Sequence, residues 1–450
     1  MVKTKVIRAL INVKILNHLK YKTQRYQHNQ KQNVYICYFY KNKLLESSCE
    51  MKELRKMCYL NSNDGTSILA FGDGPFLRID SPACFDEINQ FTTDHEKSFV
   101  FALLSYDLKN GIENLSSRNV DETNFPSVVL WRPEFVVKYE NNEYEYAQGE
   151  DQIGNDDFIR SIVNNQIVPD LNETVSFRPR TSKEQYLETV NKLKEHIQKG
   201  DIYEVNYCQE YISYNADIKN IKDTYLRLNN ITKAPFSCLF NFDEFTLFSC
   251  SPERFIKKNG LNLLAQPIKG TAKRGKNETE DKFLLKSLQN DPKERAENIM
   301  IVDLMRNDLS KVAEINSVKV DELCEIYSFE TVHQMISTVS CKVKKEYSFV
   351  DILKATFPMG SMTGAPKIRA MELIEEYEDF KRGLYSGSVG YISPNGNFDF
   401  NVIIRSMIHN KHLKTLSCSV GSAITVKSDA EKEYEECQIK IKKMIDVFKH

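Results

Sequence analysis

The amino-acid sequence predicts an α+β protein: a layered fold of antiparallel sheets covered by helices, with a smaller N-terminal lobe. In the second half of the chain, long alternating patterns typical of strands follow one another in hairpin order. Only a few helices, each with clear end signals, interrupt them. No GxGxxG motif is present, which argues against a Rossmann fold.

The chain divides into stretches of different composition. Residues 1–33 are predicted to be a basic, disordered leader or the result of an upstream start codon, because the first 45 residues contain many lysines and no acidic residue before Glu46. A transit peptide is also basic, but it would be rich in Ser and Arg, whereas this stretch has no Ser and mostly Lys. Residues 34–165, rich in Phe and Tyr, are predicted to form the N-terminal lobe, and residues 167–180 a linker or long surface loop. Residues 182–446 are expected to form the second, larger domain.

The helices and strands of the second domain follow from local patterns. Gly200 is expected to end the first helix, because glycine adopts the left-handed conformation common at helix C-termini. Helix starts are predicted at a capping box of Ser182 with Gln185, at Pro292 behind Asp291, and at Ser428 or Asp429. Strands are predicted at Phe245–Ser249, Gly387–Ile392, Phe398–Ile408 and Leu413–Val420.

Composition excludes several classes of protein. The 450 residues carry 61 Lys and Arg against 62 Asp and Glu, a formal charge of -1, which argues against a nucleic-acid binder. No apolar run is long enough to cross a membrane. The 11 cysteines are scattered and contain no CxxC pair, so neither a disulfide framework nor a zinc ribbon is expected, and a reducing cytoplasm is the predicted location.

Two pairs of glutamates could form a metal site. Glu294 and Glu297 are three residues apart on one predicted helix, and Glu433 and Glu436 are three apart on the last one. This spacing places both members of a pair on one helix face. Two such faces opposed could hold Mg²⁺ with several retained waters. Helix-capping acids and surface ion pairs with nearby lysines would give the same spacing.

Two further segments have both a structural and a functional interpretation. Asp303, Arg306, Asn307 and Asp308 in Ile301–Ser310 are polar residues in an apolar helix, and a structural ion-pair network is the favoured explanation. The segment Phe357–Lys367 is dense in Gly, Ser and Thr before a predicted helix. Its backbone N–H groups, with Ser361 and Thr363, could bind an anion, although a tight turn would look similar.

Four other residues are candidates for chemistry. Arg405 lies in the predicted strand Phe398–Ile408 among apolar neighbours, and a buried arginine needs a partner such as a carboxylate. Lys269 follows an apolar run, and a confined lysine can have a depressed pKa and act as a base or nucleophile. Glu253 could be a general acid or base, or a turn acid. His333 is by position more often a satisfied core residue than a catalyst.

Taken in order, these segments resemble the motifs of chorismate-utilising enzymes, specifically the synthase components of anthranilate synthase and of aminodeoxychorismate synthase. The resemblance covers about residues 182–446, and LLESS at Leu44–Ser48 extends it more weakly to about residue 34. The segments are GDIYEVN (200–206), SPE (251–253), PIKGT (267–271), KERAENIMIVDLMRND (293–308), FETVHQMISTV (329–339), FPMGSMTGAPK (357–367), RGLYSGSVGY (382–391), IIRS (403–406), VGSAI (420–424) and EKEYEE (431–436).

The resemblance implies a fold like that of anthranilate synthase and specific roles for these residues. Lys269 in PIKGT is similar to the lysine of aminodeoxychorismate synthases, where anthranilate synthases carry Ala. It would attack C2 of chorismate as the C4 hydroxyl leaves, and ammonia would then add at C4. Glu253 would be the general acid/base, and His333 the family's active-site histidine. The substrate carboxylates would be held by Tyr385, Arg405, Thr363 and the backbone of Gly421, and Mg²⁺ directly by Glu297 and Glu436 and through water by Glu294 and Glu433.

The resemblance also implies partners. The ammonia would come from a separate glutamine amidotransferase subunit, since no nucleophile-elbow cysteine is found in this chain. The product would serve para-aminobenzoate and folate biosynthesis. The N-terminal lobe of the family can bind tryptophan, either as an inhibitor or as a structural ligand, and LLESS alone does not decide whether it does here.

Two residues depart from the family pattern. Glu204 stands where most amine-using relatives have Gln and where water-using relatives have a lysine base. Ala423 in VGSAI replaces a usual Gly, and its Cβ would crowd a substrate carboxylate unless the backbone φ is negative. The alternatives are anthranilate synthase component I, which Lys269 argues against, and a catalytically silent homologue, which would be expected to lose Lys269 or the glutamates.

Overall fold

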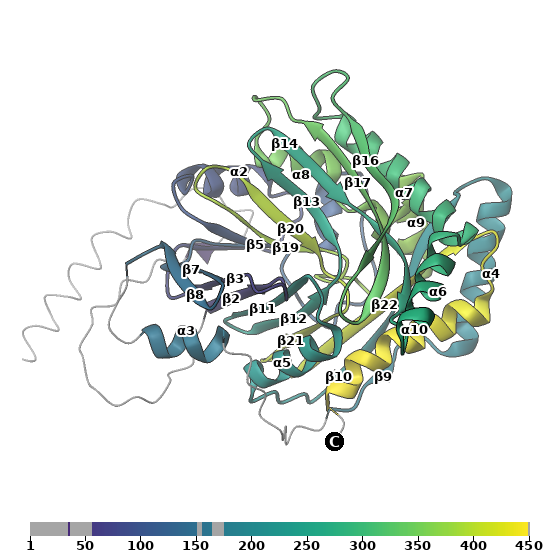
Figure 1. The fold of residues 1–450 in the computed structure, drawn as a ribbon, viewed down its shortest axis with the longest axis horizontal. Coiled ribbons are helices and arrows are strands. Elements are labelled where there is room, and N and C mark those ends of the chain that lie inside the picture. The colour runs from purple at the N-terminus through teal and green to yellow at the C-terminus, as the bar shows by residue number, and fades with distance from the viewer. Residues whose placement is uncertain (1–34, 37–55, 151–154, 164–174, 449–450) are drawn as a thin grey trace, which may run out of the picture. The chain divides into compact units, whose positions relative to one another are not determined.

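Two large antiparallel sheets form the framework of the protein (Figure 1). The computed structural model describes residues 35–36, 56–150, 155–163 and 175–448. The predicted leader, most of the predicted linker and the LLESS segment therefore lie outside the described residues. The described residues belong to one compact unit.

The first sheet combines strands from both halves of the sequence. Its 11 strands in the described residues are, in spatial order, β1 (Tyr35–Ile36), β4 (Phe76–Ile79), β6 (Val128–Trp131), β5 (Val100–Leu104), β19 (Ser388–Ile392), β20 (Phe398–Val402), β13 (Arg254–Asn259), β14 (Asn262–Gln266), β17 (Val332–Lys342) and β15 (Ile268–Lys273), with β16 (Lys319–Ser328) also pairing β17. Strand β19 pairs with β5, so the C-terminal half completes a sheet begun by the N-terminal half.

The second sheet also combines strands from both halves of the sequence. Its 11 strands in the described residues are β18 (Gly364–Ala365), β10 (Glu204–Tyr214), β22 (Thr415–Thr425), β21 (Ser406–Asn410), β12 (Phe245–Ser251), β11 (Phe236–Phe242), β2 (Lys56–Asn61), β3 (Ser67–Phe71), β7 (Phe135–Glu140) and β8 (Glu143–Gln148), with β9 (Arg178–Pro179) beside β10. Here β11 pairs with β2, again joining the two predicted stretches.

The two sheets pack face to face over an apolar core. Alternate side chains of a strand point to opposite faces, so Cys58 of β2 lies in the core between the sheets while Tyr59 faces the helices. Trp131 of β6 is fully buried and contacts Phe240 of β11 across the interface, with ring centroids 5.9 Å apart. These alternating apolar residues make the layered arrangement that the sequence predicts.

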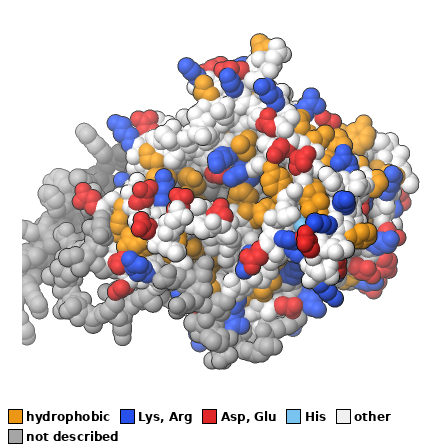
Figure 2. Space-filling model, viewed as in Figure 1, with side chains coloured by type: hydrophobic (Ala, Val, Ile, Leu, Met, Phe, Trp, Pro, Cys, Tyr) orange, Lys and Arg blue, Asp and Glu red, His pale blue; other side chains and the backbone are white. Residues whose placement is uncertain are grey.

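Helices cover the outer faces. The α-helices of the described residues are α2 (Phe85–Asp94), α3 (Asn155–Val163), α4 (Lys183–Lys199), α5 (Ile221–Thr232), α6 (Glu278–Gln289), α7 (Pro292–Ser310), α8 (Phe349–Thr356), α9 (Lys367–Tyr377) and α10 (Ala430–Ile445). Helices α4 and α10 pack against each other and against β22 (Figure 1), whereas α7 packs on β15 and β17. None of the described helices is long and apolar enough to cross a membrane. On the face shown in Figure 2, positive and negative side chains are interspersed, as the net charge predicts.

The predicted helix ends are confirmed. Ser182 forms the capping box of α4 with Gln185, and Gly200 ends this helix in the left-handed conformation. Asp291 caps α7, in which Pro292 is the first residue. Of the two residues proposed for the last helix, Asp429 is the cap.

One strand prediction is wrong. The predicted strand Phe398–Ile408 is two strands, β20 and β21, in different sheets, because the chain turns between Val402 and Ser406. Arg405 has a φ of 50°, a left-handed conformation that a regular strand cannot contain. Arg405 is therefore a turn residue and not a strand residue, and strand parity does not determine its direction.

Candidate active site

Lys269 lies in a buried ion pair. It projects from β15 of the first sheet, and its Nζ donates a 2.7 Å hydrogen bond to Oε1 of Glu204 on β10 of the second sheet. The side chain of Lys269 is 9% exposed and that of Glu204 only 1%. The pair thus joins the two sheets through two residues 65 positions apart in sequence.

The expected depressed pKa of Lys269 is not found. Burial by itself lowers the pKa of this amine, but the negative charges of Glu204, Glu297 and Glu253 outweigh burial and raise it above its usual value. These carboxylates therefore favour the ammonium form of Lys269.

Glu253 has the properties of a general acid. It is buried in the connection between β12 and β13, where the chain passes from one sheet to the other. Burial raises the pKa of Glu253 from 4.5 to about 7, although the Ser361 hydroxyl and the charge of Lys269 oppose the shift. A carboxyl group with this pKa is protonated over much of the range in which an enzyme works, and so can donate a proton.

Arg405 lies close to the carboxyl group of Glu253. It faces Glu253 and Glu436 from the turn between β20 and β21. Burial lowers the pKa of its guanidinium, and the nearby Cys250, Glu253 and Glu436 oppose that shift. Its side chain makes no ion pair or hydrogen bond with the described residues, so its donors are available for a ligand carboxylate.

The segment Phe357–Lys367 is fixed by buried contacts with β10. The backbone N–H of Asn206 donates to the carbonyl of Thr363 at 2.8 Å, and its Nδ2 to the carbonyl of Ser361 at 3.0 Å. The Thr363 hydroxyl donates within its own turn, at 3.1 Å to the carbonyl of Gly360. The short strand β18 lies within this segment, and α9 begins at its last residue, Lys367, so the predicted helix after the segment is confirmed.

Gly421 and Tyr385 both lie beside Cys208 of β10. Gly421 on β22 pairs with Cys208 on β10, and the Tyr385 hydroxyl is hydrogen-bonded to the Cys208 thiol. The departure at Ala423 is accommodated, since this residue lies in the regular part of β22 opposite Asn206, where an extended backbone accepts a Cβ.

The four predicted metal ligands come from α7 and α10, and Lys293 of α7 lies between two of them, 3.8 Å from Glu297 and 2.9 Å from Glu433. Burial and the charge of Glu436 raise the pKa of Glu294, while burial, with Glu204 and Glu294 among its neighbours, raises that of Glu297 to about 7. Oε1 of Glu297 is buried without a hydrogen-bond partner. Glu433 is paired with Lys293 at 2.9 Å.

The four side chains of this cluster are all carboxylates, the donor type that a hard cation prefers. Glu436 is paired with Lys440 at 2.7 Å. The positive charges of Lys293 and Lys440 therefore offset two of the four carboxylate charges. As arranged in the described residues, no group of three or more His, Cys, Asp and Glu residues could hold a metal ion. The mutual repulsion of the acids nonetheless suits Mg²⁺, which prefers carboxylate and water oxygens, and Oε1 of Glu297 accepts no hydrogen bond from the described residues and lies 3.8 Å from Nζ of Lys293.

His333 has partners for both ring nitrogens. In β17 it is buried, with Nδ1 2.8 Å from the Ser328 hydroxyl and Nε2 3.0 Å from Oδ1 of Asp281 on α6. Asp281 also pairs with Arg274 at 2.7 Å. These contacts fit the interpretation of His333 as a satisfied core residue, and a catalytic role for it stays a prediction.

Other motif residues are structural. Lys367 donates to the carbonyls of Thr356 and Pro358 and pairs with the buried Asp308. Arg306 pairs with Asp303 on the surface of α7 at 2.8 Å. The favoured explanation of this segment as an ion-pair network is thus consistent with the contacts. Sequence reasoning gave no role to Asn206, because an asparagine in an apolar strand has no local signature for a contact 155 residues away.

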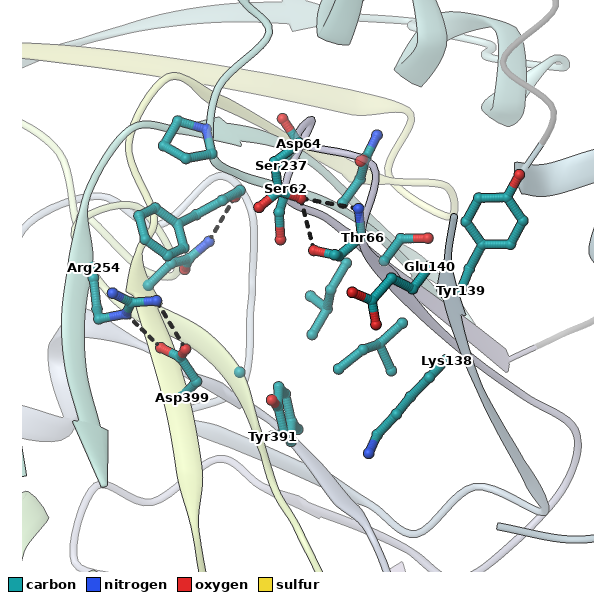
Figure 3. A pocket seen from close by; sticks show the side chains of 18 of the residues that line it. Ser62, Asp64, Thr66, Lys138, Tyr139, Glu140, Ser237, Arg254, Tyr391 and Asp399 are labelled. Carbon is teal, nitrogen blue, oxygen red and sulfur yellow. Dashed lines mark hydrogen bonds and ion pairs between the residues drawn. The ribbon is translucent and has the colours of Figure 1, made fainter. Parts of the chain in front are cut away.

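A separate cavity of about 770 Å³ is lined by strands of both sheets. Its lining residues come from β2, β3, β7, β8 and β11 of the second sheet and from β13, β19 and β20 of the first, and among the described residues they include none of the predicted catalytic or metal-binding ones. Arg254 and Asp399 face each other at one side through contacts of 2.9 and 3.1 Å, next to Tyr391, with Lys138 opposite (Figure 3).

Comparison with known proteins identifies the family. The family model described as chorismate binding enzyme matches residues 47–446. The chain belongs to the chorismate-binding enzyme family. The aminodeoxychorismate synthase component 1 of Klebsiella aerogenes is 34% identical over 346 residues, which are 76% of this chain and 75% of that protein.

Two further similarities extend this result. The chloroplastic aminodeoxychorismate synthase of Arabidopsis thaliana is 44% identical over 271 residues, or 59% of this chain, but this region spans only 29% of the plant protein. The crystal structure of anthranilate synthase component I from Streptococcus pneumoniae superposes with a TM-score of 0.69 and 24% identity, covering 96% of this chain and 97% of that one. This confirms the predicted anthranilate-synthase-like fold of the chorismate-binding enzyme.

Proposed function

We propose that this chorismate-binding enzyme is an aminodeoxychorismate synthase component 1, which converts chorismate and ammonia to 4-amino-4-deoxychorismate. The observation that carries the proposal is the buried Lys269, placed among Glu204, Glu253 and Glu297. An anthranilate synthase needs no lysine nucleophile at this position. A catalytically silent homologue would have no reason to keep a lysine in so costly a place.

The surrounding residues support an order of events. Lys269 attacks C2 of chorismate, and protonated Glu253 donates its proton to the departing C4 hydroxyl. Arg405, which lacks a partner among the described residues, binds a substrate carboxylate, with Tyr385, Thr363 and the Gly421 backbone at the other end of the substrate. Ammonia then adds at C4 and releases the lysine.

We further propose Mg²⁺ as the cofactor, held by Glu297 and Glu436, with Glu294 and Glu433 bonding to its waters. When bound, the ion makes the ring a better electron sink as the hydroxyl leaves. The described acids alone would repel the dianionic substrate, so a cation between them is also needed for binding.

The remaining expectations belong to the same proposal. Ammonia comes from a partner glutamine amidotransferase subunit, and the product enters para-aminobenzoate and folate synthesis. The described residues contain nine cysteines, all buried free thiols, which fits a reducing cytoplasm.

The cavity beside Tyr391 and Arg254 has the aromatic and charged groups to bind tryptophan. A tryptophan-dependent rise in melting temperature that Tyr391→Ala abolishes would support that assignment.

Mass spectrometry of the products tests the main proposal. Purified protein is incubated with chorismate, Mg²⁺ and an ammonium salt at alkaline pH. An aminodeoxychorismate mass that becomes para-aminobenzoate only when a lyase is added, and that is lost in Lys269→Ala, is the expected result. Anthranilate with pyruvate release would instead identify an anthranilate synthase.

A further inference from the structure

Glu204 contacts the reacting atom of Lys269 directly. One carboxylate oxygen, Oε1, accepts the 2.7 Å hydrogen bond from Nζ, whereas Oε2 is buried and has no hydrogen-bond partner among the described residues. Glu204 is held in place by β10, whose register with β22 and β18 fixes its backbone on both sides. The carboxylate is therefore pre-positioned and retains acceptor capacity.

The chemistry of the attack requires a proton acceptor. An ammonium nitrogen has no lone pair, so Lys269 must lose one proton before its nitrogen can bond to C2. We infer that Glu204 accepts this proton and is thereby a catalytic residue of the lysine-adduct step. This inference rests on the proposed function, and it gives a role to the carboxylate at a position where an amide would have no basic oxygen to offer.

The burial of both side chains favours transfer of the proton from Lys269 to Glu204. Passing the proton from Nζ to Oε1 converts an ammonium–carboxylate pair into a neutral amine and a neutral acid. Two charges then disappear from a site in which both side chains are at most 9% exposed, so the low dielectric reduces the cost of reaching the neutral pair relative to water.

The step balances. Nζ gives one proton to Oε1 of Glu204 and forms the bond to C2, the ring electrons shift, and the C4–O bond breaks. The hydroxyl leaves as water with the proton of Glu253. Ammonia then adds at C4 as the bond between C2 and Nζ breaks, and the released amine of Lys269 takes its proton back from Glu204. The ammonium group formed at C4 returns a proton to Glu253.

Other charged groups face the lysine, but geometry favours Glu204. Glu297 approaches from α7 and Glu253 from the link between β12 and β13, and Glu294 and Glu436 act at longer range. Among the described residues, only Glu204 is within hydrogen-bonding distance of Nζ. Glu253 already serves the leaving hydroxyl.

The test measures adduct formation without ammonia in Glu204→Gln, Glu204→Asp and a control, Glu210→Gln. Glu210 is an equally buried carboxylate of β10, but it pairs with Arg180 and Ser417 instead of Lys269. Intact-protein mass spectrometry follows the gain of chorismate less one water, and circular dichroism checks folding. Steady-state assays with ammonium salt give kcat and KM for chorismate.

The expected result is an adduct rate lowered about 100-fold in Glu204→Gln, with KM for chorismate nearly unchanged. The rate of this variant should rise with pH below about 7, where Glu253 keeps its proton, because solvent must then remove the proton from Lys269. Glu204→Asp should recover part of the wild-type rate. A Glu204→Gln rate within twofold of wild type, or a loss no larger than in Glu210→Gln, would overturn the inference. Product formation by the wild type without any adduct would overturn it too while leaving the amination intact, whereas a wild type that never consumes chorismate would refute the proposed function itself.

Discussion

At the residue scale, Gly421 illustrates how closely the substrate end of the site is packed. A Cβ at this position would lie 2.4 Å from Oδ1 of Asn206 and 2.6 Å from Sγ of Cys208, distances too short for real contacts. Asn206 in turn holds the carbonyl of Ser361. A side chain at residue 421 therefore displaces the segment that positions the proposed carboxylate contacts.

We predict that Gly421→Ala lowers kcat/KM for chorismate by about 10- to 100-fold, since a shift of about 1 Å in a positioning group has effects of this size. Steady-state kinetics with ammonium salt measure it. Ala423→Gly is the matched control two residues along the same strand, and it should stay near wild type. Equal losses in both variants would mean that β22 responds to any change and that Gly421 has no special role.

Glu253 gives the reaction its pH dependence. Its pKa is raised from 4.5 to about 7, so the carboxyl carries its proton below about pH 7 and loses it above. As a general acid it is active only when protonated, and we predict that the single-turnover adduct rate falls as pH rises through about 7. Working without ammonia removes the opposing effect of ammonium deprotonation. A rate that stays level to pH 9 would assign the proton to another group.

At the element scale, helices α7 and α10 are held together by charges that one cation could rearrange. Lys293 lies 2.9 Å from Glu433 and 3.8 Å from Glu297, and so offsets buried acids from both helices. Removing it leaves these carboxylates with less compensation. The proposed Mg²⁺ would supply the missing positive charge.

We predict that Lys293→Met lowers the free energy of unfolding by about 1 kcal/mol in EDTA and that Mg²⁺ restores most of the loss. Denaturant titrations with and without Mg²⁺ measure both values. Lys192→Met serves as the control, since Lys192 forms an exposed pair with Glu188 on α4. If Mg²⁺ changed the stability of wild type, Lys293→Met and Lys192→Met equally, or not at all, the metal assignment to α7 and α10 would lose its support.

The elements also show which features a sequence can reveal. The ends of α4 and α7 were predictable, because capping residues act within a few positions. The break at Arg405 was not, because its left-handed backbone is imposed by strands that leave for different sheets. The only local signal was the consecutive apolar run Val402 to Ile404, which interrupts strict alternation.

In the candidate active site, too, local features could be predicted from the sequence and long-range ones could not. The residue types around Lys269 could be assigned through ordered motifs, but the sign of its pKa shift could not. That sign depends on Glu204, Glu253 and Glu297 converging from separate elements. Burial alone, which sequence reasoning anticipates for a confined lysine, would have given the opposite shift.

At the scale of the whole molecule, the predicted boundary between residues 34–165 and 182–446 does not separate the sheets. Strand β11 relies on β2 for one set of backbone hydrogen bonds, and β19 relies on β5. Phe240 packs on Trp131 in the core between the sheets. A fragment lacking the first stretch would expose two long strand edges and an apolar sheet face.

We therefore predict that residues 175–448 expressed alone do not unfold cooperatively, whereas the full chain does, because the fragment cannot bury its half of the shared core. Thermal circular dichroism and size-exclusion chromatography compare the two. Co-expression with residues 1–165 is the control, and it should recover a soluble complex with a cooperative transition, since the missing strands are supplied in trans. A fragment that unfolds cooperatively near the midpoint of the full chain would show instead that the second stretch is an independent domain and that the shared strands add little to its stability.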